Sequence, residues 1–268
     1  MSGLNQRFTK PSALIGPRVR ISPPPPKMKT SVLIIAYNEE KHIGACIESV
    51  LRQTIPADEI IVVAHNCTDA TERIAQLYPV KLVSFQGPVG IIYARIESLK
   101  QVTGDVVLCT DGDAVVDRNW IEVMTRVLVE NKNMLVGSRV MFVGTFYNRF
   151  CNFLNTIVGW FLPCSGPKVT RVIWGPSIAF WAKNKYVVSD IFAQSYIWSR
   201  NLGLTRNPDD YWLALEMSKR GNIAYTTDTT VRAVAKELTS LDAYKRNREN
   251  NKHGKKIRAY FKSKYCHS

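Results

Sequence analysis

The residues best suited to chemistry form the short motif Asp111-Gly112-Asp113, which directly follows the apolar run DVVLCT. Two carboxylates at the end of a buried strand are costly unless a positive partner neutralises them. A divalent cation that bridges a diphosphate is such a partner, and oxygen ligands suit Mg²⁺ or Mn²⁺. Gly112 lets the backbone approach a ligand closely. The motif therefore predicts a metal site, although an ordinary aspartate turn would have the same residues.

A second pair of carboxylates lies in the run Asn207-Pro208-Asp209-Asp210. Asn207 suits a helix N-cap and Pro208 suits the first helical position, which places both acids in the first turn of a helix. Acids in a first turn can simply complement the helix dipole. Alternatively, one of them is a general base that takes a proton from an attacking hydroxyl.

The elements that must position these acids alternate between strands and helices. Apolar, β-rich runs predict strands at 31–36, 59–64, 80–85 and 105–110, and helical spacing of apolar residues separates them. This alternation predicts an α/β fold, with a mostly parallel central sheet flanked by helices. Polar residues follow the first, second and fourth runs, and ligands of such sheets bind at the carboxyl ends of the strands. We therefore expect the three polar loops to converge on a nucleotide site.

The net positive charge of the chain comes from its two ends. The 268 residues carry a formal net charge of +14. Residues 1–29 hold six basic residues and no acid, residues 245–268 hold nine basic residues and one acid, and the remainder is formally neutral. We expect a basic, proline-containing leader at 1–29, one domain at 30–244 and a basic tail at 245–268. Basic ends suit an anionic membrane or nucleic acid, and they equally suit solvated, disordered tails.

The uncharged stretch from Phe150 to Pro167 is too diluted by polar residues to be a convincing membrane span, so we expect a buried or interfacial helix there. The chain shows no apolar segment typical of a secretory signal near its start and no CxxC pair among its six cysteines. These features predict a cytoplasmic protein with reduced thiols.

Six motifs occur together in an order and spacing that resemble the family 2 glycosyltransferases of the GT-A fold. They are VLIIAYNEE, the polar loop after the second predicted strand, GPVGIIYAR, TGDVVLCTDGD, GPSIAFW and DDYWLALEMSKRG. The resemblance spans about Ser31 to Val231. It implies a single Rossmann-like GT-A domain with a nucleotide-binding half at 30–116 and an acceptor-binding half at 117–244.

The resemblance also implies roles for particular residues. Asp210 is implied as the catalytic base with Asp209 in support, and Asp113 as the metal ligand under the diphosphate, together with Asp111. The implied nucleotide-sugar site comprises Ala36, Tyr37, Asn38, Glu39, Asn66, Asp69, Arg95, Asp111, Gly112 and Asp113, and the implied acceptor side comprises Gly175, Pro176 and Ser177. The implied reaction is an inverting displacement assisted by Mn²⁺ or Mg²⁺.

The loop after the second predicted strand departs from the family pattern. The family commonly has an acidic pair in DDGSTD, whereas this chain has AHNCTD. An acid in that loop often contacts the nucleobase, so its loss leaves the donor open. The resemblance favours a UDP-sugar. His65 either replaces the missing contact or is an ordinary loop histidine.

The partners follow from the same resemblance and from the charge distribution. We expect a carbohydrate or lipid-linked acceptor, docking of the apolar stretch and basic tail at an anionic membrane, and no nucleic acid. Two rival functions remain, a nucleotidyltransferase and a nucleic-acid-binding protein that uses its basic tails. The acidic AYNEE loop argues against the first, and the neutral central domain argues against the second.

Overall fold

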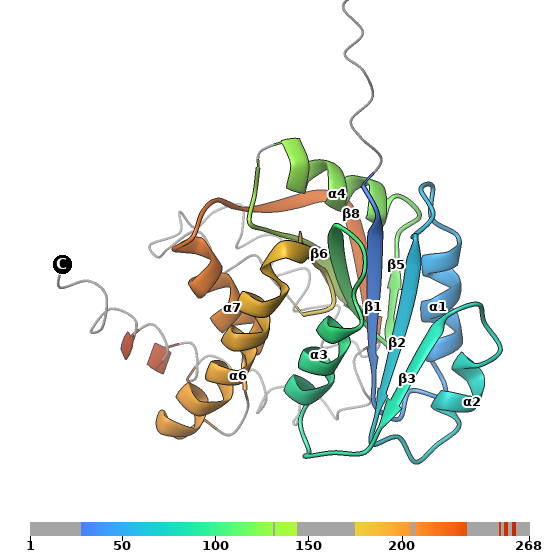
Figure 1. Cartoon of the computed structure of the whole chain (residues 1–268), viewed down its shortest axis with the longest axis horizontal. Coiled ribbons are helices and arrows are strands. Elements are labelled where there is room, and N and C mark those ends of the chain that lie inside the picture. Colours follow the sequence, from blue (N-terminus) through green and yellow to red (C-terminus); the bar gives the residue numbers. More distant parts are fainter. Residues whose placement is uncertain are drawn as a thin grey trace, which may run out of the picture.

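The computed structural model describes residues 28–130, 132–143, 175–204 and 207–234, together with residues 252, 255, 256, 259 and 260. These residues contain one eight-stranded sheet in the order β3-β2-β1-β4-β7-β6-β8-β5 (Figure 1). The strands are β1 (Thr30–Ala36), β2 (Glu59–His65), β3 (Lys81–Phe85), β4 (Val106–Asp111), β5 (Ala114–Val116), β6 (Leu135–Val143), β7 (Ile178–Trp181) and β8 (Ile223–Val234).

The half of the sheet nearest the start of the chain is parallel, since β3, β2, β1 and β4 all run in one direction. In the other half, β7 runs antiparallel to both β4 and β6, and β5 runs antiparallel to β8. β6 and β8 are parallel, and their pairing slips at Ser138 and Arg139. The prediction of a mostly parallel α/β sheet is confirmed, and the four strands expected from apolar runs all form within one residue of their predicted bounds.

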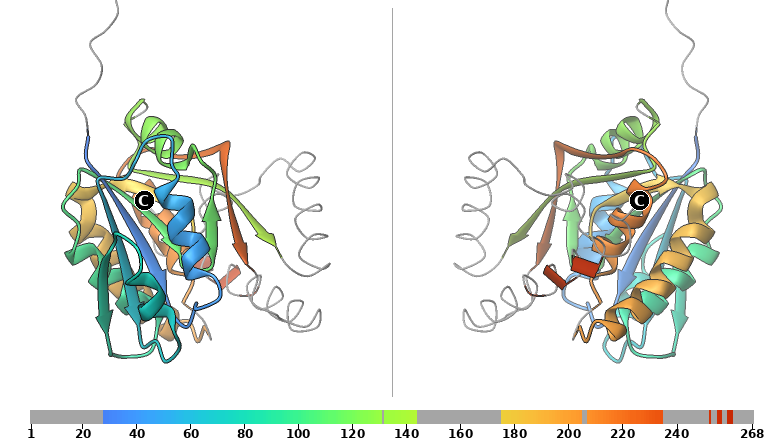
Figure 2. Two further views of the ribbon diagram at one scale, coloured as in Figure 1. Left: turned by 90° about the vertical axis from the view of Figure 1, so that its right-hand side faces the viewer. Right: turned by 90° about the vertical axis from the view of Figure 1, so that its left-hand side faces the viewer.

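Helices cover both faces of the sheet. They are α1 (Ile43–Leu51), α2 (Thr71–Ala75), α3 (Ile91–Lys100), α4 (Trp120–Glu130), α6 (Lys185–Asn201) and α7 (Asp209–Ser218), with a short 3-10 turn η2 (Ala182–Asn184) before α6. α1 and α2 lie on one side of the sheet, and α3, α6 and α7 lie on the other (Figure 1). Figure 2 shows the same two layers of helices from the sides of the molecule.

The central strand β1 shows why the sheet needs both layers. Val32 and Ile34 belong to the core that contains α1 and α4, whereas Leu33 and Ile35 belong to the core that contains α3, α6 and α7. Successive side chains of a strand point to opposite faces. An unbroken apolar strand is therefore stable only where helices cover both faces, which places β1 in the middle of the sheet.

A smaller third core lies between α6 and α7. Trp212 of α7 is fully buried there, and Trp198 of α6 packs against it with ring centroids 4.9 Å apart. Tyr260 from the C-terminal region contacts Trp212 edge-on at 5.9 Å, and Lys256 Nζ donates a hydrogen bond to the carbonyl of Leu202. Part of the basic tail therefore packs against the domain.

The start of α7 differs from the prediction in one detail. Asn207 does not cap the helix, because its amide group bonds the hydroxyls of Ser195 and Ser199 on α6 at 2.9 and 2.8 Å. α7 begins at Asp209 directly after Pro208, so both acids still lie in its first turn.

The expected interfacial helix and the expected basic leader stay predictions. The stretch from Phe150 to Pro167 lies outside the described residues, and so do residues 1–27 of the leader. In the described parts of the chain, no helix combines the length and apolar character that a membrane crossing requires. The domain bounds at 30 and 244 also remain predictions.

Candidate active site

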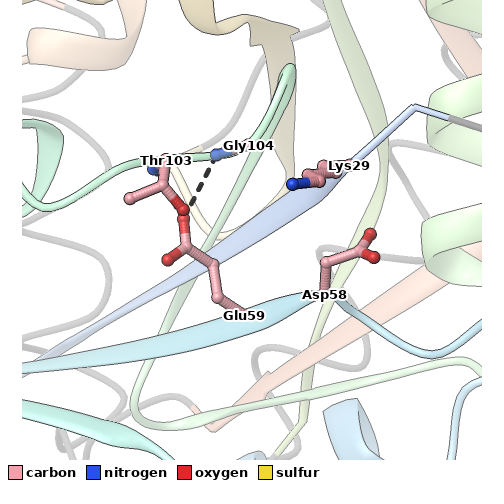
Figure 3. Close-up of a pocket in the computed structure, with 5 residues that line it drawn as sticks. All are labelled: Lys29, Asp58, Glu59, Thr103 and Gly104. Carbon is pink, nitrogen blue, oxygen red and sulfur yellow. Dashed lines mark hydrogen bonds between the residues drawn. The ribbon is translucent and has the colours of Figure 1, made fainter.

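Two pockets lie at opposite ends of the parallel strands. The pocket at the amino ends of β1 and β2 has a volume of about 310 Å³ and contains Lys29, Asp58 and Glu59 (Figure 3). Glu59 Oε1 accepts hydrogen bonds from the backbone amides of Thr103 and Gly104 and from the hydroxyl of Ser31. Burial acts to raise the pKa of Glu59, but these bonds outweigh it and hold the pKa below its usual value. This carboxylate is committed to joining strand ends, so we assign the pocket a structural role.

The pocket at the carboxyl ends of β1, β2 and β4 is the candidate donor site. Its volume is about 370 Å³. Its lining comprises Ile35, Ala36, Tyr37, Glu39, His65, Asn66, Val89, Gly90, Ile91, Ala94, Asp111, Gly112 and Asp113. Seven of the ten residues assigned to the nucleotide-sugar site are among them, so the structure brings together most of the predicted set. The remaining three are Asn38, Asp69 and Arg95.

Asn38 and Asp69 hold the loops that frame this pocket. Asn38 has a positive φ of 53°, which asparagine tolerates better than most residues. Its side chain accepts a bond from the backbone amide of Thr68 at 2.8 Å. Asp69 accepts bonds from the backbone amides of Glu40 and Thr71, both at 3.0 Å. The two residues therefore join the loop after β1 to the loop after β2.

The predicted metal motif lines the pocket, and its backbone is closely packed against β1. A Cβ atom on Gly112 would lie 3.1 Å from Ala36 Cβ and 3.2 Å from the carbonyl oxygen of Ile35. The Gly112 amide donates to that same carbonyl at 2.8 Å. A larger residue at this position would therefore have to push the backbone or Ala36 aside by a few tenths of an ångström, so glycine suits the close packing between Asp111 and Asp113.

These two acids fit a cation that is shared with a diphosphate. No group of three His, Cys, Asp or Glu side chains within the described ranges forms a complete cage for a metal. Mg²⁺ commonly takes only one or two carboxylates and completes its shell with phosphate oxygens and water. Asp111 and Asp113 are oxygen donors at the wall of the pocket, so the residues present suit this kind of site.

Arg95 lies behind the wall of the donor pocket. Its side chain is 5% exposed, and its Nε lies 2.7 Å from Asp209 Oδ2. Its Nη2 lies 3.5 Å from Asp111 Oδ1. Burial acts to lower the pKa of the guanidinium, but Asp209 and then Asp111 outweigh it and raise the pKa above its usual range. The structure thus connects the two acidic motifs through one buried cation.

Asp210 has a different environment from Asp209. Its Oδ1 accepts a hydrogen bond from its neighbour Tyr211 at 2.8 Å, and its Oδ2 accepts one from the Gly175 amide at 3.3 Å. Burial, and next the charge of Asp209, raise the pKa of Asp210 to about 6. A carboxylate with a pKa near neutrality suits a general base.

The three residues expected on the acceptor side are all buried. Gly175 contacts the acidic cluster through its amide bond to Asp210. Ser177 is fully buried, and its hydroxyl accepts a hydrogen bond from Trp120 Nε1 at 3.0 Å and pairs with the Ser138 hydroxyl at 2.5 Å. Ser177 therefore joins α4 to the sheet, whereas Gly175 lies beside the carboxylates.

His65 occupies the end of the pocket where the family pattern has an acid. It is 4% exposed and stacks on Phe85 with ring centroids 4.5 Å apart. Burial lowers the pKa of the imidazole, so the ring is neutral at pH 7. The neighbouring Asn66 cannot readily turn toward a base, because its amide group exchanges two hydrogen bonds with Gly87.

Sequence reasoning missed the part of the pocket wall formed by the loop before α3 and the first residue of that helix. Val89 is 91% exposed and Ile91 is 42% exposed at the mouth of the pocket. They face the same cavity as Tyr37, which is 56% exposed. The motif GPVGIIYAR could have indicated this wall, because its apolar residues Val89 and Ile91 lie just before and at the start of the helix, outside the apolar stripe that packs on the sheet.

The fold is shared with solved glycosyltransferases of the GT-A class. The solved structure of glucosyl-3-phosphoglycerate synthase from Mycobacterium tuberculosis, in complex with Mn²⁺, UDP and phosphoglyceric acid, matches with a TM-score of 0.53 and 20% identity, over 81% of this chain and 74% of that chain. The UDP complex of Staphylococcus aureus TarS 1–349 matches with a TM-score of 0.52 and 17% identity, over 84% of this chain and 65% of that chain.

Sequence comparison identifies the family. Residues 31–162 match the model of Glycosyl transferase family 2, and the chain therefore carries a family 2 glycosyltransferase domain. A glucosyl-dolichyl phosphate glucuronosyltransferase from Haloferax volcanii is 30% identical over 121 residues, which is 42% of this chain and 39% of the relative. The chain spans less than half the length of the first curated relatives that it matches.

Proposed function

We propose that this protein transfers a sugar from a nucleotide-sugar donor to an acceptor hydroxyl by direct, inverting displacement. The observation that carries the proposal is that the donor pocket and the acid pair of α7 are adjacent. Asp111 lines the donor pocket and also contacts Arg95, and Arg95 contacts Asp209, which precedes Asp210 at the start of α7. The donor pocket and a carboxylate with a raised pKa are thus parts of one cluster.

In this reaction the acceptor oxygen bonds to the anomeric carbon as the bond from that carbon to the diphosphate oxygen breaks. The acceptor's proton passes to the Asp210 carboxylate, and the nucleoside diphosphate leaves with the bonding electrons. Asp210 is suited to this role because backbone amides hold both of its oxygens in place. General-base catalysis of this kind typically contributes about 10² to 10⁴ in rate.

Asp113, with Asp111, would hold a divalent cation beneath the diphosphate. When bound, a cation there supplies positive charge that stabilises the leaving group. Mn²⁺ is supported by the M. tuberculosis neighbour, whose complex contains Mn²⁺ and UDP, and Mg²⁺ suits the same oxygen donors.

We favour a UDP-sugar as donor. Two neighbours of the same fold are complexes with UDP. In the pocket, the exposed ring of Tyr37 and the apolar side chains of Val89 and Ile91 offer a surface for a flat base. A neutral His65 at the far end avoids the desolvation cost that a buried charge would have.

For the acceptor, we propose a carbohydrate carried on a lipid, reached at the cytoplasmic face of an anionic membrane. The name of the H. volcanii relative describes transfer to a dolichyl-phosphate-linked sugar. Residues 245–268 of this chain supply a net charge of +8, and basic residues near such a surface contribute about 1 kcal/mol each. Equal sedimentation of the full chain and of a chain lacking residues 245–268 with phosphatidylserine vesicles at low salt would contradict the membrane proposal.

A thermal-shift panel tests the proposed donor. The full chain is melted with UDP, GDP, CDP and ADP and with their common sugar conjugates, each with and without Mn²⁺. A ligand that binds only the folded state at 100 times its Kd adds about 2.7 kcal/mol of stability. We expect the largest rise in Tm for a uridine nucleotide with Mn²⁺. A rise caused by polynucleotides and by none of the mononucleotides would favour the nucleic-acid-binding alternative.

A further inference from the structure

Arg95 is a buried cation that contacts the acidic cluster from behind the donor pocket. It comes from α3, whereas Asp111 comes from the end of β4 and Asp209 from the start of α7. The guanidinium carbon also lies 5.8 Å from the ring centroid of Phe192 on α6. One side chain thus contacts three elements besides its own, and it is 95% removed from solvent.

The guanidinium lies so close to the backbone of residue 175 that a side chain there would require Arg95 to move. A Cβ atom on Gly175 would lie 2.6 Å from Arg95 Nη2, which is closer than real Cβ contacts allow. The same glycine donates its amide proton to Asp210 Oδ2 at 3.3 Å. Arg95 therefore packs against the backbone that holds Asp210 while forming its ion pair with the neighbouring Asp209.

Resting on the proposed transferase function, we propose that Arg95 is a positioning residue that holds Asp209 in an ion pair and leaves Asp210 as the carboxylate of the pair that takes the acceptor's proton. Two adjacent acids at the start of a helix are chemically alike, and a cation beside one of them makes them different. The Arg95 guanidinium lies 2.7 Å from Asp209, whereas the two oxygens of Asp210 accept hydrogen bonds from backbone amides. Asp210 has the raised pKa that proton abstraction at neutral pH requires.

A purely structural role for Arg95 predicts a different result. A buried ion pair can hold elements together without influencing chemistry, and removal of one partner then destabilises the fold because the other charge is left alone. Stability alone cannot separate the two roles. A positioning role also predicts a fall in kcat with little change in donor affinity, because a reacting group displaced by 1 Å can lose about 10² in rate.

The experiment compares Arg95→Lys, Arg95→Met and the double variant Arg95→Met/Asp209→Asn with the unchanged chain. Lysine keeps the charge but lacks the planar fork that reaches two carboxylates at once. The double variant removes both charges of the Arg95–Asp209 ion pair, so Asp209 is not left as an unpaired buried charge. Arg126→Met is the matched control, because Arg126 forms an ion pair with Asp228 at 3.5 Å on the surface, with both side chains about half exposed. Tm, calorimetric affinity for UDP with Mn²⁺, kcat, KM and the pH profile of kcat are measured for each.

We expect Arg95→Lys to lower kcat about 10²-fold while the affinity for UDP changes less than about threefold. Within the described ranges, the charged groups that act on Asp210 are Asp209 and Arg95, and the Arg95 charge acts to lower the pKa of Asp210. The acid limb of kcat should therefore move to higher pH in Arg95→Met. The double variant should regain most of the Tm that Arg95→Met loses but little of its kcat.

Three results would overturn the inference. Arg95→Lys could keep kcat within about threefold of the unchanged chain, the double variant could regain kcat together with Tm, or Arg95→Lys could lose donor affinity while kcat at saturation stays the same. If Arg95→Met does not fold, Arg95→Lys and the double variant decide the question. An unchanged chain that transfers no sugar contradicts the proposed function itself, whereas an active chain with an active Arg95→Lys contradicts only the role of Arg95.

Discussion

The donor pocket and the acid cluster are adjacent, but they are built in opposite ways. The pocket is open, and its mouth carries apolar side chains such as Tyr37 and Val89 that are more than half exposed. The cluster is closed and charged, with Arg95 and Asp209 both at least 91% buried. An open wall can adapt to a bound ligand at little cost, whereas buried charges interact strongly and tolerate little displacement. Changes in the pocket should therefore affect donor binding, and changes in the cluster should affect turnover.

The largest effect that tests this contrast is expected for Asp210→Asn. The substitution removes a basic carboxylate and keeps the side chain's size, so we expect kcat to fall about 10² to 10⁴-fold while donor affinity stays nearly unchanged. Asp209→Asn should be milder, because Asp209 is committed to Arg95. Transfer kinetics and calorimetry on both variants measure this. An inactive Asp209→Asn beside an active Asp210→Asn would reverse the assignment of the base.

Asp113→Asn should instead weaken donor binding. It removes one of the two carboxylates suited to the cation, so we expect the Mn²⁺-dependent part of UDP affinity to fall at least about tenfold, which is about 1.4 kcal/mol. Calorimetry with and without Mn²⁺ measures this part directly. Asp228→Asn is the control, because Asp228 is an exposed acid on β8. Unchanged Mn²⁺ dependence in Asp113→Asn would falsify the metal assignment.

The acid cluster should also determine the pH dependence. Since burial and Asp209 raise the pKa of Asp210 to about 6, the base is increasingly protonated below pH 6, and kcat should fall about tenfold per pH unit there. The folded state binds this proton more tightly than the unfolded state, so Asp210 contributes stability below its ordinary pKa and loses it as the pH rises through 6. The Tm of Asp210→Asn should therefore exceed that of the unchanged chain above pH 6. A flat kcat between pH 5 and pH 7.5 would exclude Asp210 as the titrating base.

The smallest expected effect lies where the tail meets the catalytic helix. Tyr260→Ala removes an edge-on contact with Trp212, and such aromatic pairs contribute about 0.5 to 1.5 kcal/mol. We expect the free energy of unfolding to fall by about 1 kcal/mol and kcat to stay within about twofold. Tyr186→Ala is the control, because Tyr186 is 74% exposed. A large loss of kcat in Tyr260→Ala would show that the tail acts on the acid cluster through α7.

The amino-acid sequence by itself was sufficient for the parallel half of the sheet and for most of the donor pocket. A strand covered on both faces appears as an unbroken apolar run, and the polar residues that follow it must lie at the carboxyl edge of the sheet. Tyr37, Asn66 and Asp111 could therefore be assigned to one pocket from the sequence. The antiparallel half was less accessible, because β5 has only three residues and the strand β7 is also short.

Only the tertiary structure decided which polar side chains face the pocket and which form hydrogen bonds or ion pairs that stabilise its walls. Asn38 and Asp69 bond neighbouring loops, Ser177 bonds Trp120, and Arg95 pairs with Asp209 behind the pocket wall. The local pattern indicates which side chains of a strand or helix share a buried face, because that follows from the periodicity of the element. The partner of a charged side chain depends instead on which distant segments the fold brings within a few ångströms. For that reason Asp209 and Asp210 are alike in the sequence and distinct in the folded protein.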